Sequence, residues 1–395
     1  MKNNGHVQAV PMEQTIESAC ELPPAGVPDV GRGDRPRVVV AMSGGVDSST
    51  AAALLVEQGY DVIGVMMRIW GEATADGPST GSGHGVNRCC SPKAVADARS
   101  VAGYLGIPFY LLDFQDEFKK YVVDYFVAEY AAGRTPSPCI MCNRHIRFRF
   151  LLQRALALEA DYLATGHYAR IRQTADGPYQ LLKGIDPQKD QSYFLYMLGQ
   201  TQLRHVLFPV GGYTKPQIRQ MAGERGLPVA EKAESQELCF LADGDYRRFI
   251  QDYAPEAVMP GPVVDSSGKM LGRHAGLPLY TIGQRRGLGI AVGEPVYVLD
   301  MDRGRNALVV GPDQALHQRE ITVHTVSYVA GEPPVGEMAV AAKIRSMGTE
   351  TPATLVPLEA GRARLLFETP VRAVAPGQAA VFYDSDVVVG GGTIE

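Results

Sequence analysis

The sequence predicts an α/β fold with an N-terminal domain on a parallel sheet, a small mainly helical central domain and a C-terminal β-barrel. Between residues 37 and 165, apolar strand-length runs alternate with helix-length segments, the pattern of a parallel sheet with right-handed crossovers. From residue 263 onward, short β-like runs are evenly spaced between turns, which indicates a small barrel. We therefore expect a disordered extension over 1–35 and domains over 36–205, 206–262 and 263–395.

The elements of the first domain follow from local composition. RVVVAM at residues 37–42 is a β-branched run typical of a buried parallel strand, and strong helix formers fill 50–58. A second strand is expected over 61–67, a Gly/Ser-rich loop over 71–87, strands over 109–112 and 162–165, and helices over 93–105, 117–132 and 147–160. The strands expected after residue 263 include VYVLD, ALVVG, ITVHTVSYV, AVAAKI, RARLLFE and AAVFY.

Composition limits the class of protein. The chain has 395 residues with 38 basic and 43 acidic side chains, so a net charge of −5 argues against a uniformly basic nucleic-acid coat. A local basic patch remains compatible with that charge. Six cysteines in this length exclude a disulfide-stapled scaffold. No apolar run reaches the roughly 20 residues that span a bilayer, and residues 1–33 lack a secretory apolar core. We expect a cytoplasmic protein with reduced thiols and no membrane partner.

The segment SGGVDSS at residues 43–49 stands between the first expected strand and helix. Glycines let the backbone approach a phosphate, and N–H groups at a helix N-terminus can bind an anion. The segment is neither a Walker A loop nor a GxGxxG dinucleotide loop. The plain alternative is a structural turn capped by serine. The full string resembles the pyrophosphate loop of the ATP-pyrophosphatase superfamily, which implies adenylation chemistry, ATP phosphates on Ser43 to Ser48, and Asp47 near Mg²⁺.

Cys139 and Cys142 form C-x-x-C on an expected loop, and Cys239 lies far away in ESQELCF. Three interpretations stay open: inert buried thiols, iron–sulfur ligands with one open position, or a redox pair or sulfur nucleophile. A zinc site lacks a second C-x-x-C. Residues 134–158 contain five arginines, one histidine and no acid, a field that would lower the thiol pKa of Cys142 and attract RNA phosphates. The alternative is a solvated basic helix face. Cys89 and Cys90 receive no role, and Cys20 is expected to be incidental.

An adenylating loop combined with separated thiols suggests ATP-dependent sulfur transfer. From about residue 37 to the C-terminus, the sequence resembles the tRNA-specific 2-thiouridylase family, which thiolates the wobble uridine (position 34). The matching motifs are AMSGGVDSS, GRTP-x-P-x-x-x-CN, ATGHYAR, KDQSYFL, ESQ-x-x-CF, YTIGQRRGLGI and PGQAAVFY. The chemistry agrees, because uracil O2 leaves readily only after adenylation and thiolate sulfur is an effective nucleophile. An unstacked anticodon base also suits a pocket.

The resemblance implies roles at matching positions. Cys239 would carry sulfur as a persulfide, and Cys142 would be the nucleophile that forms a disulfide with it. The ATP site would include Ala41, Met42, Ser43, Gly44, Gly45, Val46, Asp47, Ser48, Met67 and Gly166. The tRNA, a Lys, Glu or Gln acceptor, would contact Ser137, Pro138, Cys139, His167, Lys189, Asp190, Gln191, Arg345, Ser346 and Gln378. ATP with Mg²⁺ and a persulfide-donor protein are implied as well.

Two positions depart from the family pattern. Cys139 stands where many relatives carry aspartate, so a general acid is not expected there, and a cluster or an alternative disulfide becomes an option. The main alternative function is an iron–sulfur-dependent tRNA thiolase with Cys139, Cys142 and Cys239 as ligands. Arg345-Ser346 replaces an Arg-Tyr pair and so loses an aromatic stacking surface. Two further classes stay open: an ATP-dependent ligase or amidotransferase acting on another substrate, and a catalytically silent tRNA-binding module.

Overall fold

A computed structural model describes residues 35–72, 91–174, 177–233 and 238–395. The expectations for the N-terminal extension, for the Gly/Ser-rich loop and for Cys20, Cys89 and Cys90 fall outside these residues, apart from the flanking positions 35, 71 and 72. Residues 36–395 form one unit that contains three sheets. The α/β fold class predicted from the sequence is confirmed.

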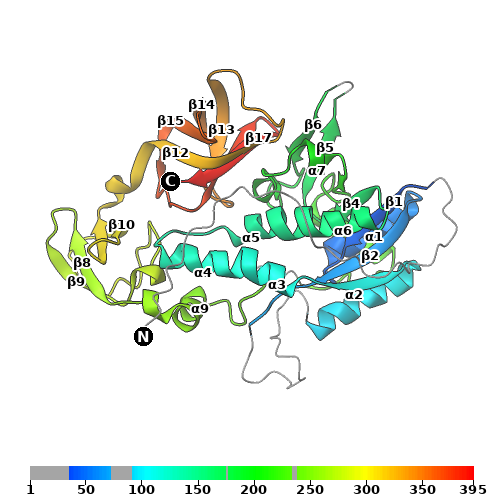
Figure 1. Ribbon diagram of the computed structural model, residues 1–395, viewed down its shortest axis with the longest axis horizontal. Coiled ribbons are helices and arrows are strands. Elements are labelled where there is room, and N and C mark those ends of the chain that lie inside the picture. The colour runs from blue at the N-terminus through cyan, green and yellow to red at the C-terminus, as the bar shows by residue number, and fades with distance from the viewer. Residues whose placement is uncertain (1–34, 73–90, 175–176, 234–237) are drawn as a thin grey trace, which may run out of the picture. The chain divides into compact units, whose positions relative to one another are not determined.

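The N-terminal domain is built on a parallel sheet of strand order β3-β2-β1-β4-β7 (Figure 1). Alternate residues of β1 enter different cores: Val38 and Val40 pack with α1 and α2, whereas Val39 packs with the helical segments on the other face. Both faces are therefore covered, which explains why the strand is apolar after Arg37. The strands are β1 (Arg37–Ala41), β2 (Asp61–Arg68), β3 (Phe109–Asp113), β4 (Tyr162–Thr165) and β7 (Val206–Leu207), and the first helices are α1 (Val46–Glu57) and α2 (Pro92–Leu105).

Two long helical segments differ from the helices expected from the sequence. Both contain a π-helical stretch, and the second begins earlier than expected. The first comprises α3 (Gln115–Phe118), the π-helical η1 (Lys119–Val123) and α4 (Asp124–Ala131); the second comprises α5 (Pro138–Met141), the π-helical η2 (Cys142–Leu151) and α6 (Leu152–Ala157). The helix expected from residue 147 thus starts at Pro138, in the N1 position that proline favours. Cys139 and Cys142 consequently lie in helical backbone, and the expected loop around them is wrong.

The central part contains helices followed by its own antiparallel and parallel strand pairings. Its four-stranded sheet has the order β10-β11-β8-β9. The runs VYVLD and ALVVG, grouped with the barrel strands from the sequence, form β10 and β11 of this separate sheet. Its elements are α8 (Lys215–Glu224), α9 (Tyr246–Tyr253), β8 (Gly261–Asp265), β9 (Met270–His274), β10 (Tyr297–Asp302) and β11 (Ala307–Gly311), with 3-10 turns η4 (Pro255–Ala257), η5 (Leu277–Leu279) and η6 (Asp313–Leu316). The 3-10 turn η3 (Ser192–Phe194) and helix α7 (Gln200–Leu203) precede β7 in the N-terminal domain.

The C-terminal strands form a closed antiparallel barrel in the order β12-β15-β14-β13-β16-β17, closed by the pairing of β12 with β17. A hairpin of β5 (Ala169–Gln173) and β6 (Tyr179–Lys183) extends this sheet, because Val387 of β17 pairs with Leu182. The barrel strands are β12 (His317–Tyr328), β13 (Met338–Lys343), β14 (Thr351–Leu358), β15 (Arg362–Arg372), β16 (Ala379–Asp384) and β17 (Val387–Ile394). Within the described part of the chain, no helix has both the length and the apolar character to cross a membrane.

Candidate active site

The phosphate-type loop connects β1 to α1. Gly44 has φ of +68°, and a Cβ there would stand 2.4 Å from the carbonyl oxygen of Ala94, so only glycine fits this turn. The backbone N–H of Ser43 donates to Ser48 Oγ at 3.1 Å, which closes the loop. Helix α1 begins earlier than the sequence indicated and has Gly45 at its N-cap without a side-chain cap. Its first N–H groups are therefore suited to an anion.

The other residues expected around ATP gather at the same edge of the sheet. Strands β1, β2 and β4 are parallel, so their carboxyl ends meet, and strand order reverses between β1 and β4, where open α/β sheets bind ligands. Gly166 directly follows β4, and a Cβ there would lie 2.7 Å from the backbone nitrogen of Ser48. Met67 is the second-last residue of β2 and is half-buried. The chain thus brings the ATP residues expected from the sequence to one edge.

Asp47 of the loop has partners that sequence reasoning missed. Lys215 Nζ lies 2.6 Å and 2.8 Å from the two carboxylate oxygens, and the Tyr168 hydroxyl donates to Oδ1 at 2.7 Å. Lys215 begins α8 and its side chain is 8% exposed, so a largely buried ammonium group is paired with this carboxylate. Lys232 holds the loop from another side by donating to the Gly44 carbonyl at 2.8 Å. Tyr168 belongs to ATGHYAR, but nothing in the local sequence indicated either lysine.

His167 is held as a neutral ring beside the loop. Its Nδ1 lies 2.6 Å from Thr165 Oγ1, and its ring contacts Phe148 and Phe208 with centroid distances of 5.9 Å each. Burial, helped by the nearby charge of Arg147, lowers the pKa of His167 to about 3. At neutral pH this side chain offers hydrogen bonds but no positive charge.

Lys189, Asp190 and Gln191 lie next to the ATGHYAR motif, which contains His167 and Tyr168. Gln191 and Tyr168 exchange hydrogen bonds: the Gln191 N–H donates to the Tyr168 carbonyl at 2.9 Å, and the Tyr168 N–H donates to Gln191 Oε1 at 3.1 Å. The Asp190 carboxylate accepts from the Gly184 N–H and from both the N–H and the hydroxyl of Ser192. Asp190 thus shapes its own turn, while Lys189 precedes it and donates its N–H to the carbonyl of Asp186.

The barrel supports the segment that precedes the first cysteine. Gln378 Nε2 donates to the carbonyls of Thr135 and Pro136 at 3.1 Å and 3.2 Å, and the Thr135 N–H donates to the Pro376 carbonyl. Ser137 then takes the N-cap position of α5, with Pro138 buried and Cys139 exposed. The structure therefore brings Gln378 together with the residues expected near the target base.

Cys142 and Cys239 pack on one hydrophobic core. Cys142 is 5% exposed at the start of η2, and Cys239 is partly buried against the same cluster, beside the fully buried Phe240. Among the residues that the structure describes, no three His, Cys, Asp or Glu side chains are grouped to hold a metal ion. Cys139, Cys142 and Cys239 are not grouped in this way, so the iron–sulfur alternative is not favoured.

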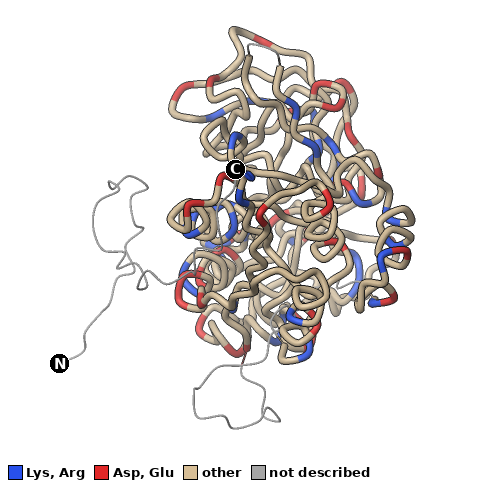
Figure 2. The backbone as a smooth tube through the Cα atoms, turned by 90° about the vertical axis from the view of Figure 1, so that its right-hand side faces the viewer, with Lys and Arg blue, Asp and Glu red and all other residues tan. Residues whose placement is uncertain are grey.

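The remaining expected contacts lie on the barrel and on η2. Arg345 and Ser346 occupy the turn after β13, where Arg345 donates to the Ala373 carbonyl and the next residue, Met347, is 91% exposed. Burial lowers the pKa of Arg345 below its usual range. Of the five arginines counted between 134 and 158, Arg134 is paired with Glu129, which reduces the expected field. Figure 2 shows basic and acidic positions interspersed along the described chain.

Comparisons with known proteins cover the whole of this architecture. Family models match as the tRNA methyl transferase HUP domain over residues 36–243, the tRNA methyl transferase PRC-barrel domain over 247–312 and the aminomethyltransferase beta-barrel domain over 318–394. Among solved structures, NMN synthetase from Francisella tularensis aligns with 56% of this chain and 78% of its own at 15% identity and a TM-score of 0.31.

Two relatives match nearly from end to end. The tRNA-specific 2-thiouridylase MnmA of Moorella thermoacetica is 54% identical over 359 residues, which cover 90% of this chain and 99% of that protein. The protein of the same name from Chloroflexus aurantiacus is 50% identical over 357 residues, covering 90% and 98%. The chain therefore belongs to the tRNA-specific 2-thiouridylase family.

Proposed function

We propose that this chain is a tRNA-uridine 2-sulfurtransferase that activates the C2 oxygen of the wobble uridine with ATP and replaces it with sulfur. One observation carries the proposal: the SGGVDSS loop, with an open helix N-terminus, lies against Gly166 at the carboxyl edge of a parallel sheet. Family membership supplies the substrate class, since the relatives are named for 2-thiouridine in tRNA.

The first step is adenylation. Ser43 to Ser48 would hold the phosphates of ATP, and Asp47 would lie near Mg²⁺, which would neutralise phosphate charge when bound. Lys215 stands at the same carboxylate and adds a positive charge where negative charge accumulates. Uridine O2 attacks the α-phosphorus, pyrophosphate leaves, and the C2–O bond becomes a bond to a good leaving group.

The second step delivers sulfur. A donor protein loads Cys239 as a persulfide, and the Cys142 thiolate attacks the Cys239 sulfur. That attack forms the Cys142–Cys239 disulfide and releases hydrosulfide, which attacks C2 and expels AMP. A thiol reductant then restores both cysteines. The pairing rests on the matching motifs GRTP-x-P-x-x-x-CN and ESQ-x-x-CF, and both thiols contact the same extended core cluster.

The proposed tRNA contacts lie beside the phosphate loop and on the barrel. Ser137 to Cys139 are proposed to contact the target base. Gln378 bonds to the carbonyls of Thr135 and Pro136, just before them, which supports that segment. Neutral His167 is proposed to contact RNA through hydrogen bonds. Lys189 to Gln191 and the Arg345-Ser346 turn complete the proposed surface. Lysine, glutamate and glutamine tRNAs are the proposed acceptors.

Mass spectrometry of nucleosides tests the function. Purified protein is incubated with unmodified tRNA, ATP and a persulfide source, and 2-thiouridine at the wobble position is expected together with AMP and pyrophosphate. The Cys142→Ser, Cys239→Ser double variant should yield no thiolated product. Full ATP turnover by that variant on another acceptor would point instead to a ligase, and ATP left intact in the presence of tRNA would point to a silent binding module.

A further inference from the structure

A buried carboxylate holds the chain just beyond Cys239. Glu72 is 5% exposed and lies four residues after the end of β2, the strand that carries Met67 to the ATP edge. Its Oε2 accepts the backbone N–H of Ala242 at 3.2 Å. Since Ala242 is three residues after Cys239, at most about 11 Å of extended chain separates the two Cα atoms, at roughly 3.6 Å per residue.

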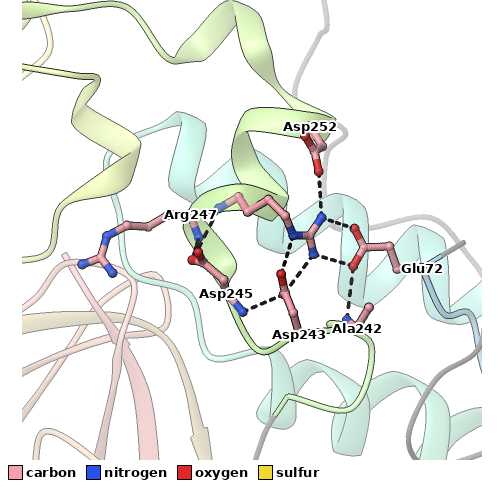
Figure 3. A network of polar contacts seen from close by, with 7 residues as sticks. Glu72, Ala242, Asp243, Asp245, Arg247 and Asp252 are labelled. Carbon is pink, nitrogen blue, oxygen red and sulfur yellow. Dashed lines mark hydrogen bonds and ion pairs between the residues drawn. The ribbon is translucent and has the colours of Figure 1, made fainter. Parts of the chain in front are cut away.

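One arginine fixes this carboxylate completely. Arg248 on α9 donates to Glu72 at 2.5 Å and 2.7 Å, to Asp243 at 2.7 Å and 3.0 Å, and to Asp252 at 2.7 Å. Figure 3 shows the carboxylates of Glu72, Asp243 and Asp252 around one unlabelled guanidinium group, which their ion pairs identify as that of Arg248. All five N–H donors are thereby used, a fork that an ammonium group cannot reproduce.

Apolar contacts also hold the segments of Glu72 and Cys239 against α9, but they do not fix the position of one segment relative to another. Trp70, two residues before Glu72, meets the rings of Phe249 and Tyr253 at centroid distances of 6.2 Å and 5.8 Å. Phe240, next to Cys239, meets Phe249 at 5.7 Å. Such contacts are non-directional, whereas the network of Glu72 and Arg248 is directional and ends on a backbone N–H of the cysteine segment.

We propose that Glu72 and Arg248 are positioning residues that set where Cys239 lies relative to Cys142 and to the ATP edge of β2. This inference rests on the proposed function, because Cys239 needs a fixed position only if it passes sulfur to a partner. Neither residue touches the reacting atoms. Their effect is on the approach of one thiol to the other, and misplacement of reacting groups by about 1 Å can cost on the order of 100-fold in rate.

The test uses the full-length variants Arg248→Lys and Glu72→Gln. Arg305→Lys is the matched control, because Arg305 makes an exposed ion pair with Asp302 in the β10–β11 turn. The first readout is the rate at which the oxidant diamide forms the Cys142–Cys239 disulfide without substrates, measured by mass spectrometry of the digested protein. We expect both variants to be about 10- to 100-fold slower than wild type and the control to be unchanged.

The second readout is the ratio of 2-thiouridine formed to pyrophosphate released in a single turnover. A positioning role lowers this ratio while the KM for ATP stays at the wild-type value. A general loss of folded protein would lower both products together and leave the ratio unchanged. An unchanged or faster disulfide rate in both variants, or its absence in wild type, overturns the inference. Absence of 2-thiouridine from wild type, with the disulfide rates as expected, rejects the proposed function and leaves the positioning of Cys239 standing.

Discussion

Replacing Gly166 by alanine should weaken ATP binding specifically. The added Cβ would lie 2.7 Å from the Ser48 nitrogen and 2.9 Å from the Asp47 carbonyl carbon, and both are backbone atoms of the phosphate loop. Contacts this short force the loop to move, since backbone cannot rotate away as a flexible side chain can. Overpacking of this kind costs about 1–3 kcal/mol, which corresponds to roughly a 5- to 150-fold loss if it falls on the nucleotide-binding conformation.

The assay is the dissociation constant of ATP measured by calorimetry, with the KM for tRNA as the internal comparison. Gly103→Ala is the control, because its Cβ would meet nothing within 4 Å in helix α2. It should leave ATP binding unchanged and raise helix stability by about 0.5–1 kcal/mol. If folded Gly166→Ala binds ATP as tightly as wild type, the assignment of this edge to the phosphates is refuted.

Three other predictions follow from the site. Lys215→Met should lower the free energy of unfolding in urea by about 1–3 kcal/mol, because the Asp47 carboxylate is only 32% exposed and loses a hydrogen-bonding partner. Lys119→Met breaks an exposed pair and should cost less than about 1 kcal/mol. Equal losses would contradict this. Burial lowers the pKa of His167 to about 3. Its contribution to the free energy of unfolding is therefore full above pH 6.5 and is lost as the pH falls from 6.5 toward 3. His167→Gln should flatten that loss, by up to about 1.4 kcal/mol per pH unit, and an identical pH profile would exclude the effect. Cys139→Ser should retain 2-thiouridine formation, because that side chain is exposed and takes part in neither proposed sulfur step. Cys142→Ser should abolish 2-thiouridine formation. Equal loss in the two variants would contradict these roles.

The sequence predicted those features that are encoded over a few neighbouring residues. The run RVVVAM, the loop SGGVDSS and the following helix were recognisable because strand burial, glycine conformations and helix propensity act locally. The boundaries were less secure: α1 starts at Val46, inside the loop motif, and the second long helical segment starts at Pro138. The assignment of ALVVG to the barrel failed because an apolar strand pattern does not specify its partner strand.

What the sequence by itself determined was the α/β class, the phosphate-type loop and the thiols available for chemistry. Only the tertiary structure decided which distant groups meet them. Lys215 reaches Asp47 across 168 residues, Glu72 reaches Arg248 across 176, and β12 meets β17 to close the barrel. The physical reason is that periodicity records which face of an element is buried, whereas an ion pair or a strand pairing depends on two segments whose separation leaves no local signal.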